Sequence, residues 1–245
     1  MEWWKRFFDN TRYGDTLEHF TPERTEAEVD FVLSALQLEK GARILDLCCG
    51  VGRHSVQFAA RGYRVTGLDF NEDYIRKARM LAEETGVEAE FVRADMRRIP
   101  RGKKYDAVVN LFTSFGYFER DAENFKVLGA VSRCLEPGGR FVLDLLNRDW
   151  LMRNFIEKDW TEEPDSYTLQ EREFDSERGA VVCRWIWIRN GRAKEHTSSV
   201  KQYTYGELEK ELKARGMKIE NCYGDFTGNP LDLDNPQMII VARKK

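Results

Sequence analysis

The sequence lacks several features that mark particular classes of protein. No stretch of about 18 apolar residues occurs in its 245 residues, so we expect no membrane-spanning helix. It begins Met-Glu-Trp-Trp-Lys-Arg-Phe-Phe, with an early acid and no continuous apolar core, which is unlike a secretory signal. We therefore expect a cytoplasmic protein.

Cysteine and histidine are also scarce, and their spacing excludes two kinds of site. The five cysteines are an odd number, include one adjacent pair and form no C-x-x-C pair; they are Cys48, Cys49, Cys134, Cys183 and Cys222. This pattern matches neither a disulfide framework nor a cysteine zinc site. The three histidines show no metal-ligand spacing, so we expect no bound metal.

The charges nearly balance, with 39 Lys and Arg against 42 Asp and Glu. A protein dedicated to the nucleic-acid backbone is usually basic, so we expect no such partner. The hydrophobic share of 42% and the charged share of 33% are typical of a globular chain with a sizeable core. We treat residues 1–245 as a single domain.

Alternating strand and helix patterns dominate the middle of the chain. Short apolar strands are expected at 42–47, 63–68, 89–93, 105–111 and 140–145, with helices at 53–60 and 71–84 between them. This order predicts βαβ units in a doubly wound, Rossmann-like α/β sheet of seven mostly parallel strands. The last strands, 217–223 and 237–242, have no crossover helix between them, so we expect an antiparallel pair there.

Two segments depart from this alternation. Residues 1–40 are expected to form a helical lid, in which Thr21 caps a helix that has Pro22 at its first position. Residues 165–204 are expected to form three antiparallel strands, with a hairpin turn at Asn190-Gly191. Trp185 and Trp187 share one face of this insertion, which we expect to pack internally or to serve a homodimer contact.

The most informative stretch is Ile44-Leu45-Asp46-Leu47-Cys48-Cys49-Gly50-Val51-Gly52-Arg53-His54. A strand ends here, small residues turn the chain, and a helix begins, so a ligand can approach the backbone closely. Asp69 and Asp95 end the next two strands, and such strand ends share one crevice. Each acid alone could instead cap a helix or a turn. A dinucleotide site would need G-x-G-x-x-G, and its third glycine is absent.

On these residues, with Tyr105-Asp106 and Pro137-Gly138-Gly139, the chain from about 21 to 242 resembles the class I S-adenosylmethionine-dependent methyltransferases. The specific likeness is to a small bacterial and archaeal type whose first motif reads D-L-C-C-G-x-G-R-H. The ending 237–242 fits the reversed seventh strand of that family. Cys48 departs from the broader family, which commonly has glycine there.

The resemblance implies roles for individual residues. Asp46 would orient the ammonium group of the cofactor through the loop, to which Cys49, Gly50 and Gly52 would contribute close backbone. Asp69 would bind the ribose hydroxyls and Asp95 the adenine amino group. The remaining expected contacts are Phe70 and Met96 at the adenine, Asn110 and Leu111 beside the methionine and its sulfonium, and Tyr13 and Arg24 at the carboxylate. Tyr13 and Arg24 could equally lie on a solvated helix face.

The reaction implied is an in-line transfer of the activated methyl group from S-adenosylmethionine to a nitrogen, oxygen or carbon nucleophile, which leaves S-adenosylhomocysteine. Such a transfer depends on alignment and water exclusion more than on a strong base. Strand-end positions suggest four catalytic candidates: Tyr117, Tyr203, Tyr223 and Asp225. His54 is interpreted as a structural helix residue rather than as a base.

The acceptor is expected to be a small molecule. The fourth strand ends in Asn110-Leu111 and lacks the Asn/Asp-Pro-Pro-Tyr/Phe motif of many enzymes that methylate amino groups of nucleic acids or glutamine. A tRNA or protein methyltransferase and a non-catalytic S-adenosylmethionine-binding module stay open as alternatives.

Overall fold

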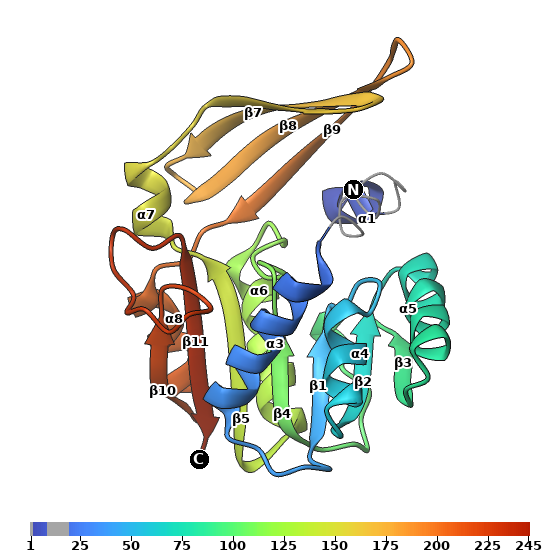
Figure 1. Ribbon diagram of the computed structural model, residues 1–245. Coiled ribbons are helices and arrows are strands. Elements are labelled where there is room, and N and C mark those ends of the chain that lie inside the picture. The colour runs from blue at the N-terminus through green and yellow to red at the C-terminus, as the bar shows by residue number, and fades with distance from the viewer. Residues whose placement is uncertain (1, 9–19) are drawn as a thin grey trace.

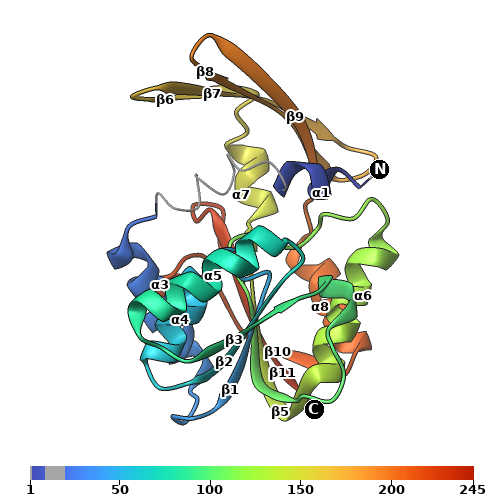
Figure 2. The same ribbon diagram turned by 90° about the vertical axis from the view of Figure 1, so that its right-hand side faces the viewer.

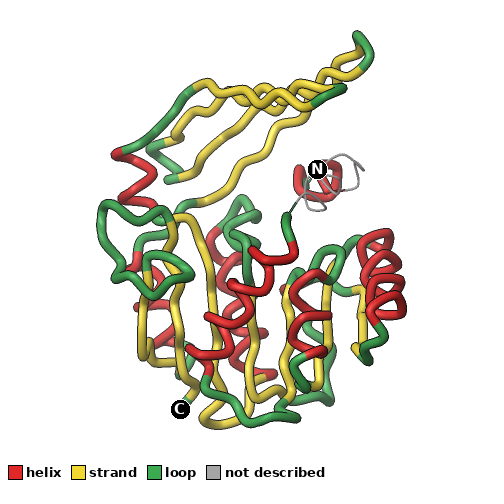
Figure 3. Tube along the Cα trace, viewed as in Figure 1, coloured by secondary structure: helices red, strands yellow, loops and turns green. Residues whose placement is uncertain are grey.

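Two sheets form the framework of the structure, a computed structural model that describes residues 2–8 and 20–245. The larger sheet has seven strands in the order β10-β11-β5-β4-β1-β2-β3, and the smaller has four in the order β6-β7-β8-β9. Figure 3 draws the strands of both sheets in yellow. Strands β1 to β5 are parallel, and β11 is antiparallel to both β5 and β10. The large sheet comprises β1 (Arg43–Leu47), β2 (Arg64–Asp69), β3 (Ala89–Arg93), β4 (Tyr105–Asn110), β5 (Leu135–Leu146), β10 (Met217–Tyr223) and β11 (Gln237–Lys244). The predicted doubly wound fold is confirmed.

Helices cover both faces of the large sheet. On one face lie α3 (Pro22–Leu36), α4 (Arg53–Ala60) and α5 (Glu72–Thr85), and on the other lie α6 (Asp121–Cys134) and α8 (Tyr205–Ala214) (Figure 2). Successive residues of β1 point to opposite faces of the sheet and join two apolar cores: Ile44 lies in one core with Val32 of α3, and Leu45 lies in the other with Leu128 of α6. All four side chains are fully buried. The sheet is therefore held on both sides by apolar burial.

Local sequence signals fix where the helices begin. The Thr21 side chain accepts a hydrogen bond from the Arg24 amide, and Pro22 occupies the first turn of α3, as predicted. The Asn71 side chain caps α5 by accepting from the amides of Asp73 and Tyr74. These caps set the entry of each helix relative to the strand before it.

The small sheet has one strand more than predicted. It comprises β6 (Lys158–Glu163), β7 (Ser166–Asp175), β8 (Ala180–Arg189) and β9 (Arg192–Lys201), and it follows the short helix α7 (Arg148–Arg153). β6 escapes sequence reasoning because all six of its residues, Lys-Asp-Trp-Thr-Glu-Glu, are exposed and show no apolar alternation. The turn at Asn190-Gly191 is confirmed, with both residues at positive φ.

The first helix, α1 (Trp3–Phe8), lies between the two sheets, near the carboxyl ends of the parallel strands (Figure 1). Its Phe7 ring contacts Trp185 and Trp187 of β8, with ring centroids 5.6 and 5.8 Å apart. The tryptophan face of the small sheet therefore packs on α1. No helix in residues 2–8 and 20–245 has the length and apolar character that a membrane span requires.

Candidate functional site

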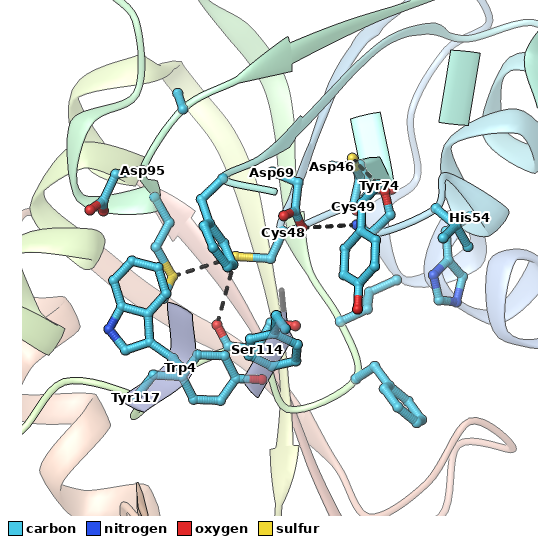
Figure 4. Close-up of a pocket in the computed structure, with 18 of the residues that line it drawn as sticks. Trp4, Asp46, Cys48, Cys49, His54, Asp69, Tyr74, Asp95, Ser114 and Tyr117 are labelled. Carbon is cyan, nitrogen blue, oxygen red and sulfur yellow. Dashed lines mark hydrogen bonds between the residues drawn. The ribbon is translucent and has the colours of Figure 1, made fainter. Parts of the chain in front are cut away.

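One cavity opens at the carboxyl ends of β1 to β4, between α1 and the glycine loop, residues 48–52. In Figure 4, Asp46, Asp69 and Asp95 lie along one side of it, and Trp4, Ser114 and Tyr117 lie on the other. Of the residues assigned to the cofactor from the sequence, the structure brings together at this cavity Asp46, Cys49, Gly50, Asp69, Phe70, Asp95, Met96 and Leu111.

The glycine loop is shaped by backbone contacts to β2 and α5. The amides of Cys48 and Cys49 donate to the carbonyl oxygen of Leu68, at 2.7 and 3.0 Å. Gly52 has a φ of 86°, and a Cβ atom there would lie 2.8 Å from the Cβ of Ala78 on α5. Gly52 does not line the cavity. It acts through the close packing of α4 on α5.

Cys48 stands in a backbone conformation that favours glycine, with a φ of 65°. A glycine, which the resemblance leads us to expect at this position, would adopt this conformation without strain. The Cys48 thiol lies 3.5 Å from the Met96 sulfur and 4.0 Å from the Ser114 carbonyl oxygen (Figure 4). Burial raises the pKa of this thiol well above its usual value, so it stays protonated and is a poor nucleophile.

Asp69 is the central acid of the cavity. Its carboxylate accepts hydrogen bonds from the Gly50 amide at 3.1 Å and the Asn71 amide at 2.9 Å, and the side chain is buried. Burial outweighs these hydrogen bonds and raises the pKa of Asp69 to about 6. The carboxylate thus joins the glycine loop to the start of α5 and faces the cavity.

Asp46 is held by the helix that follows the loop. Its carboxylate accepts a hydrogen bond of 2.6 Å from the Ser55 hydroxyl, and burial raises its pKa. The bond fixes the end of β1 against α4, where the loop backbone turns toward the cavity. This placement agrees with the expected role of Asp46, which is to orient the cofactor's ammonium group by holding the loop backbone.

Asp95 caps a 3₁₀ turn, η1 (Met96–Arg98), as the simpler interpretation of this acid predicted. Its carboxylate accepts from the Arg97 amide at 2.9 Å and from the Arg97 guanidinium at 2.6 Å. Burial acts to raise the pKa of Asp95, but the hydrogen bonds from Arg97 hold it below its usual value. Arg97 also pairs with Glu2 and Glu123, so this side of the cavity is tied to the segment that precedes α1.

Asn110 lies behind the cavity rather than at its surface. Its side chain is fully buried, and its amide donates a 2.8 Å hydrogen bond to the Leu47 carbonyl oxygen. The resemblance implied that Asn110, at the end of the fourth strand, would lie beside the methionine of the cofactor. Its contact shows that it joins β4 to β1, while the neighbouring Leu111 reaches the cavity.

Three of the four catalytic candidates, Tyr203, Tyr223 and Asp225, lie away from this cavity. The Tyr203 hydroxyl is buried and donates to Asp121 at 2.7 Å. Tyr223 packs on Phe31, and Asp225 accepts the bonds of its own turn from Thr227. The last two belong to or follow β10, four strands from β1, which is roughly 19 Å at the usual strand spacing. Tyr117 alone of the four lines the cavity.

The arginine that lines the cavity is Arg53 and not the predicted Arg24. Arg24 is half-exposed and pairs with Glu28 at 2.9 Å, and Tyr13 lies outside the described residues. Arg53 donates to Glu28 at 2.6 Å through one nitrogen, while its other terminal nitrogen is buried without a hydrogen bond. The sequence offered one indication that Arg53 would line the cavity, namely its position directly after Gly52.

Glu28 gathers a buried cluster of charges where α3 meets α4. It accepts from Arg24 and Arg53, and one of its oxygens lies 2.8 Å from the His54 ring. Burial acts to raise the pKa of Glu28, but His54 and Arg53 outweigh it and lower the pKa to about 2. Burial lowers the pKa of His54 despite this partner. These contacts agree with the structural interpretation of His54.

Aromatic rings from distant segments close the other side of the cavity. Trp4 of α1 meets Phe70 and Phe118 edge-on, with ring centroids 4.7 and 5.8 Å apart. The Trp3 indole donates to the Tyr117 carbonyl oxygen at 3.1 Å, and Asn71 donates to the Phe8 carbonyl oxygen at 2.8 Å. Sequence reasoning missed Trp4 and Phe8 as lining residues, because nothing local shows where a short aromatic helix will dock.

Matches to known proteins agree with this geometry. Residues 44–139 match the family model described as a methyltransferase domain. The dTDP-3-amino-3,4,6-trideoxy-alpha-D-glucopyranose N,N-dimethyltransferase of Streptomyces venezuelae is 27% identical over 207 residues, which cover 80% of this chain and 84% of that protein. The chain is an S-adenosylmethionine-dependent methyltransferase.

Solved structures share the fold of this methyltransferase. An S-adenosylmethionine-dependent methyltransferase from Clostridium acetobutylicum superimposes with a TM-score of 0.81 at 15% identity, covering 94% of each chain. CalS10, an amino pentose methyltransferase from Micromonospora echinaspora, has a TM-score of 0.70 at 22% identity and covers 98% of this chain and 97% of its own. The cofactor is S-adenosylmethionine, and the cavity suits it: a buried carboxylate stands beside a small-residue loop, with apolar rings and a thioether nearby.

Proposed function

We propose that the methyltransferase transfers a methyl group from S-adenosylmethionine to an amino nitrogen of a small molecule. The observation that carries this proposal is the aromatic half of the cavity, formed by Trp4, Phe8, Phe112 and Tyr117. Aromatic faces attract the ammonium form of an amine and exclude water, and a cavity lined by such rings suits a small acceptor. The relatives from Streptomyces and Micromonospora, which are named for an amino sugar and an amino pentose, support a nitrogen acceptor.

The cofactor would lie across the strand ends, in keeping with the D-L-C-C-G-x-G-R-H type of first motif. Asp69 would accept from the ribose hydroxyls, and Phe70 and Met96 would flank the adenine. Because Arg97 already occupies the Asp95 carboxylate, the adenine amino group would share that acceptor with a guanidinium. Arg53, with its buried open nitrogen, replaces Arg24 as the candidate for the carboxylate of the cofactor.

The protein's own contribution would be alignment and exclusion of water. S-adenosylmethionine supplies a methyl group that is already activated on its sulfonium sulfur. Trp4 and Phe8 of α1 cover the cavity, and the glycine loop fixes the other wall, so the two reactants would meet in one orientation. Orientation of this kind can lower a barrier by about 7–11 kcal/mol. Tyr117 is the remaining candidate for a group that contacts the acceptor.

We retain a single domain with residues 1–40 as its lid, and a homodimer through the small sheet, whose outer face exposes Trp160 and Tyr167. We expect no nucleic-acid substrate, because several of the basic residues near η1 pair with acids, as Arg97 with Asp95 and Lys103 with Glu90.

An acceptor screen tests the proposal. Methyl transfer from labelled S-adenosylmethionine is measured with amino sugars, amino acids, phenols, bulk tRNA and a protein lysate as acceptors. Transfer to a small amine supports the proposal, and transfer to a phenol moves the acceptor atom to oxygen. Transfer only to tRNA or protein overturns the small-molecule assignment. Cofactor binding without transfer to any acceptor would favour a non-catalytic binding module.

A further inference from the structure

Asp144, in the middle of the large sheet, is a buried acid that none of the roles above uses. It lies on β5 with only 2% of its surface exposed. One carboxylate oxygen accepts a 2.8 Å hydrogen bond from the Phe112 amide, and the other accepts from the Gln237 side chain at 3.2 Å. The Asp144 carbonyl oxygen accepts from the Thr113 amide at 3.1 Å. A single residue thus binds two successive amides of the segment that follows β4.

That segment has an unfavourable backbone. Phe112 and Thr113 have φ angles of 58° and 53°, in the left-handed region that favours glycine. A β-branched residue such as threonine is especially rare there. Two adjacent non-glycine residues in this region persist only when their surroundings hold them, and such strain clusters at functional sites. The hydrogen bonds to Asp144 supply that restraint.

The strained pair determines what the next residue presents to the cavity. Phe112 and Ser114 both line it, and the Ser114 carbonyl oxygen faces the Cys48 thiol at 4.0 Å (Figure 4). A thiol is a weak donor, so this carbonyl oxygen retains capacity to accept a stronger hydrogen bond. The Phe112 ring packs edge-on against the Phe20 ring, with centroids 4.8 Å apart.

We propose that Asp144 is a positioning residue for methyl transfer, which holds the Phe112–Thr113 turn so that the Ser114 carbonyl oxygen orients the N–H group of an amine acceptor. This inference rests on the proposed amine substrate. In the transfer, the nitrogen lone pair forms the new bond to carbon while the carbon–sulfur bond breaks and its electron pair stays on sulfur. The extra proton leaves the product ammonium for solvent, and the carbonyl oxygen accepts only a hydrogen bond.

The charge of Asp144 supports this role. Burial raises its pKa to about 7, although the Phe112 amide and Gln237 favour the ionised form. From α3 the buried Glu28 opposes ionisation, and from α4 Arg53 favours it, while His54 of α4 pairs with Glu28. The ionised carboxylate is the better acceptor for the two donors. The restraint on the turn should therefore weaken as the pH falls below about 7.

The test compares two cofactor analogues in wild-type protein and Asp144→Asn. S-adenosylhomocysteine has no group at the methyl position, whereas sinefungin carries an amino group there. We expect the variant to bind S-adenosylhomocysteine within about threefold of wild type and sinefungin about tenfold more weakly. A parallel loss for both ligands, or no loss for either, overturns the inference. Asp149→Asn, on the exposed first turn of α7, is the matched control.

A rescue variant separates positioning from a general loss of structure. Thr113→Gly removes the backbone penalty that Asp144 offsets, so in the Asp144→Asn background it should recover at least about threefold of the sinefungin affinity. Absence of recovery in a folded double variant contradicts the inference. With the acceptor from the screen, Asp144→Asn should lower kcat more than it raises KM. If wild type methylates no amine, the proposed substrate fails, while the ratio of the two analogue affinities still decides the role of Asp144.

Discussion

The two halves of the cavity are assembled in different ways. The cofactor half comes from consecutive strand ends, so Asp46, Asp69 and Asp95 lie within 50 positions of one another. The other half joins residues far apart in the chain: Trp3 bonds to Tyr117, 114 positions away, and Lys201 of β9 bonds to Gly116. The first half depends on tight backbone packing and buried polar groups, and the second on aromatic rings that dock on it. Mutations should therefore damage the two halves differently.

The largest effect is expected from Gly52→Ala, which attacks the packing of the cofactor half. The added Cβ would lie 2.8 Å from the Cβ of Ala78, and the alanine backbone would have to keep a φ of 86°. Overpacking costs about 1–3 kcal/mol and left-handed backbone about 1–2 kcal/mol, so the unfolding free energy should fall by roughly 2–5 kcal/mol. Denaturant unfolding measures it.

The matched control is Gly86→Ala at the end of α5. Gly86 has a φ of 67°, but a Cβ there meets nothing within 4 Å. Only the backbone cost of about 1–2 kcal/mol should appear. If the unfolding free energy falls equally in the two variants, the close packing of Gly52 against Ala78 of α5 does not contribute to stability.

The next effect is on affinity rather than on folding. Asp69→Ala removes a charged acceptor for the ribose hydroxyls, so S-adenosylmethionine should bind about 1.5–3 kcal/mol more weakly, roughly 10- to 150-fold. Because the pKa of Asp69 is raised to about 6, its charged form is lost as the pH falls below that value, and wild-type affinity should fall with it. Calorimetric titration at pH 5 to 8 measures both effects.

Asp73→Ala, an exposed acid in the first turn of α5, is the control for Asp69. It should leave the affinity and its pH dependence unchanged. An Asp69→Ala protein that is folded and binds with wild-type affinity would remove Asp69 from the ribose site.

The difference between the halves also explains what the sequence could predict. The strand–loop–helix pattern around Gly50 and the acids at successive strand ends predicted the sheet and most of the cofactor half, because those features are local and the topology brings them together. The distance of Tyr223 and Asp225 from the cavity was missed because strand order is not local: β10 ends up at the edge of the sheet. Tyr203 precedes α8, and its burial against Phe115 and Phe125 depends on contacts between segments far apart in the chain. Trp4 and Phe8 were missed as lining residues because the docking of α1 depends on partners such as Trp187 and Tyr117.

A smaller effect should follow Phe7→Ala, which loosens the aromatic half without touching the cavity lining. Phe7 is buried against Trp185 and Trp187 and anchors α1 to the small sheet. Because α1 has only six residues, its release should be a local opening that leaves the melting temperature nearly unchanged. We expect kcat/KM for the acceptor to fall about fivefold, close to 1 kcal/mol.

Arg6→Ala, on the exposed side of the same helix, is the control for Phe7 and should keep wild-type turnover. If Phe7→Ala instead lowers the melting temperature strongly, α1 is part of the cooperative core. The two halves of the cavity would then unfold together, and mutations would not affect them differently.

The smallest effect is expected at Cys48, where the halves meet. Cys48→Gly relieves a residue at a φ of 65° but removes the sulfur contacts to Met96 and Ser114. The relief of about 1 kcal/mol and the lost contacts should nearly cancel, so stability should change by less than about 1 kcal/mol. Affinity for S-adenosylhomocysteine should also stay close to wild type, because the loop backbone keeps its bonds to Leu68. Denaturant unfolding and calorimetry measure these two quantities. A large loss of affinity with stability unchanged would show that the thiol itself contacts the cofactor, and the cofactor half would then depend on the Cys48 side chain as well as on the loop backbone.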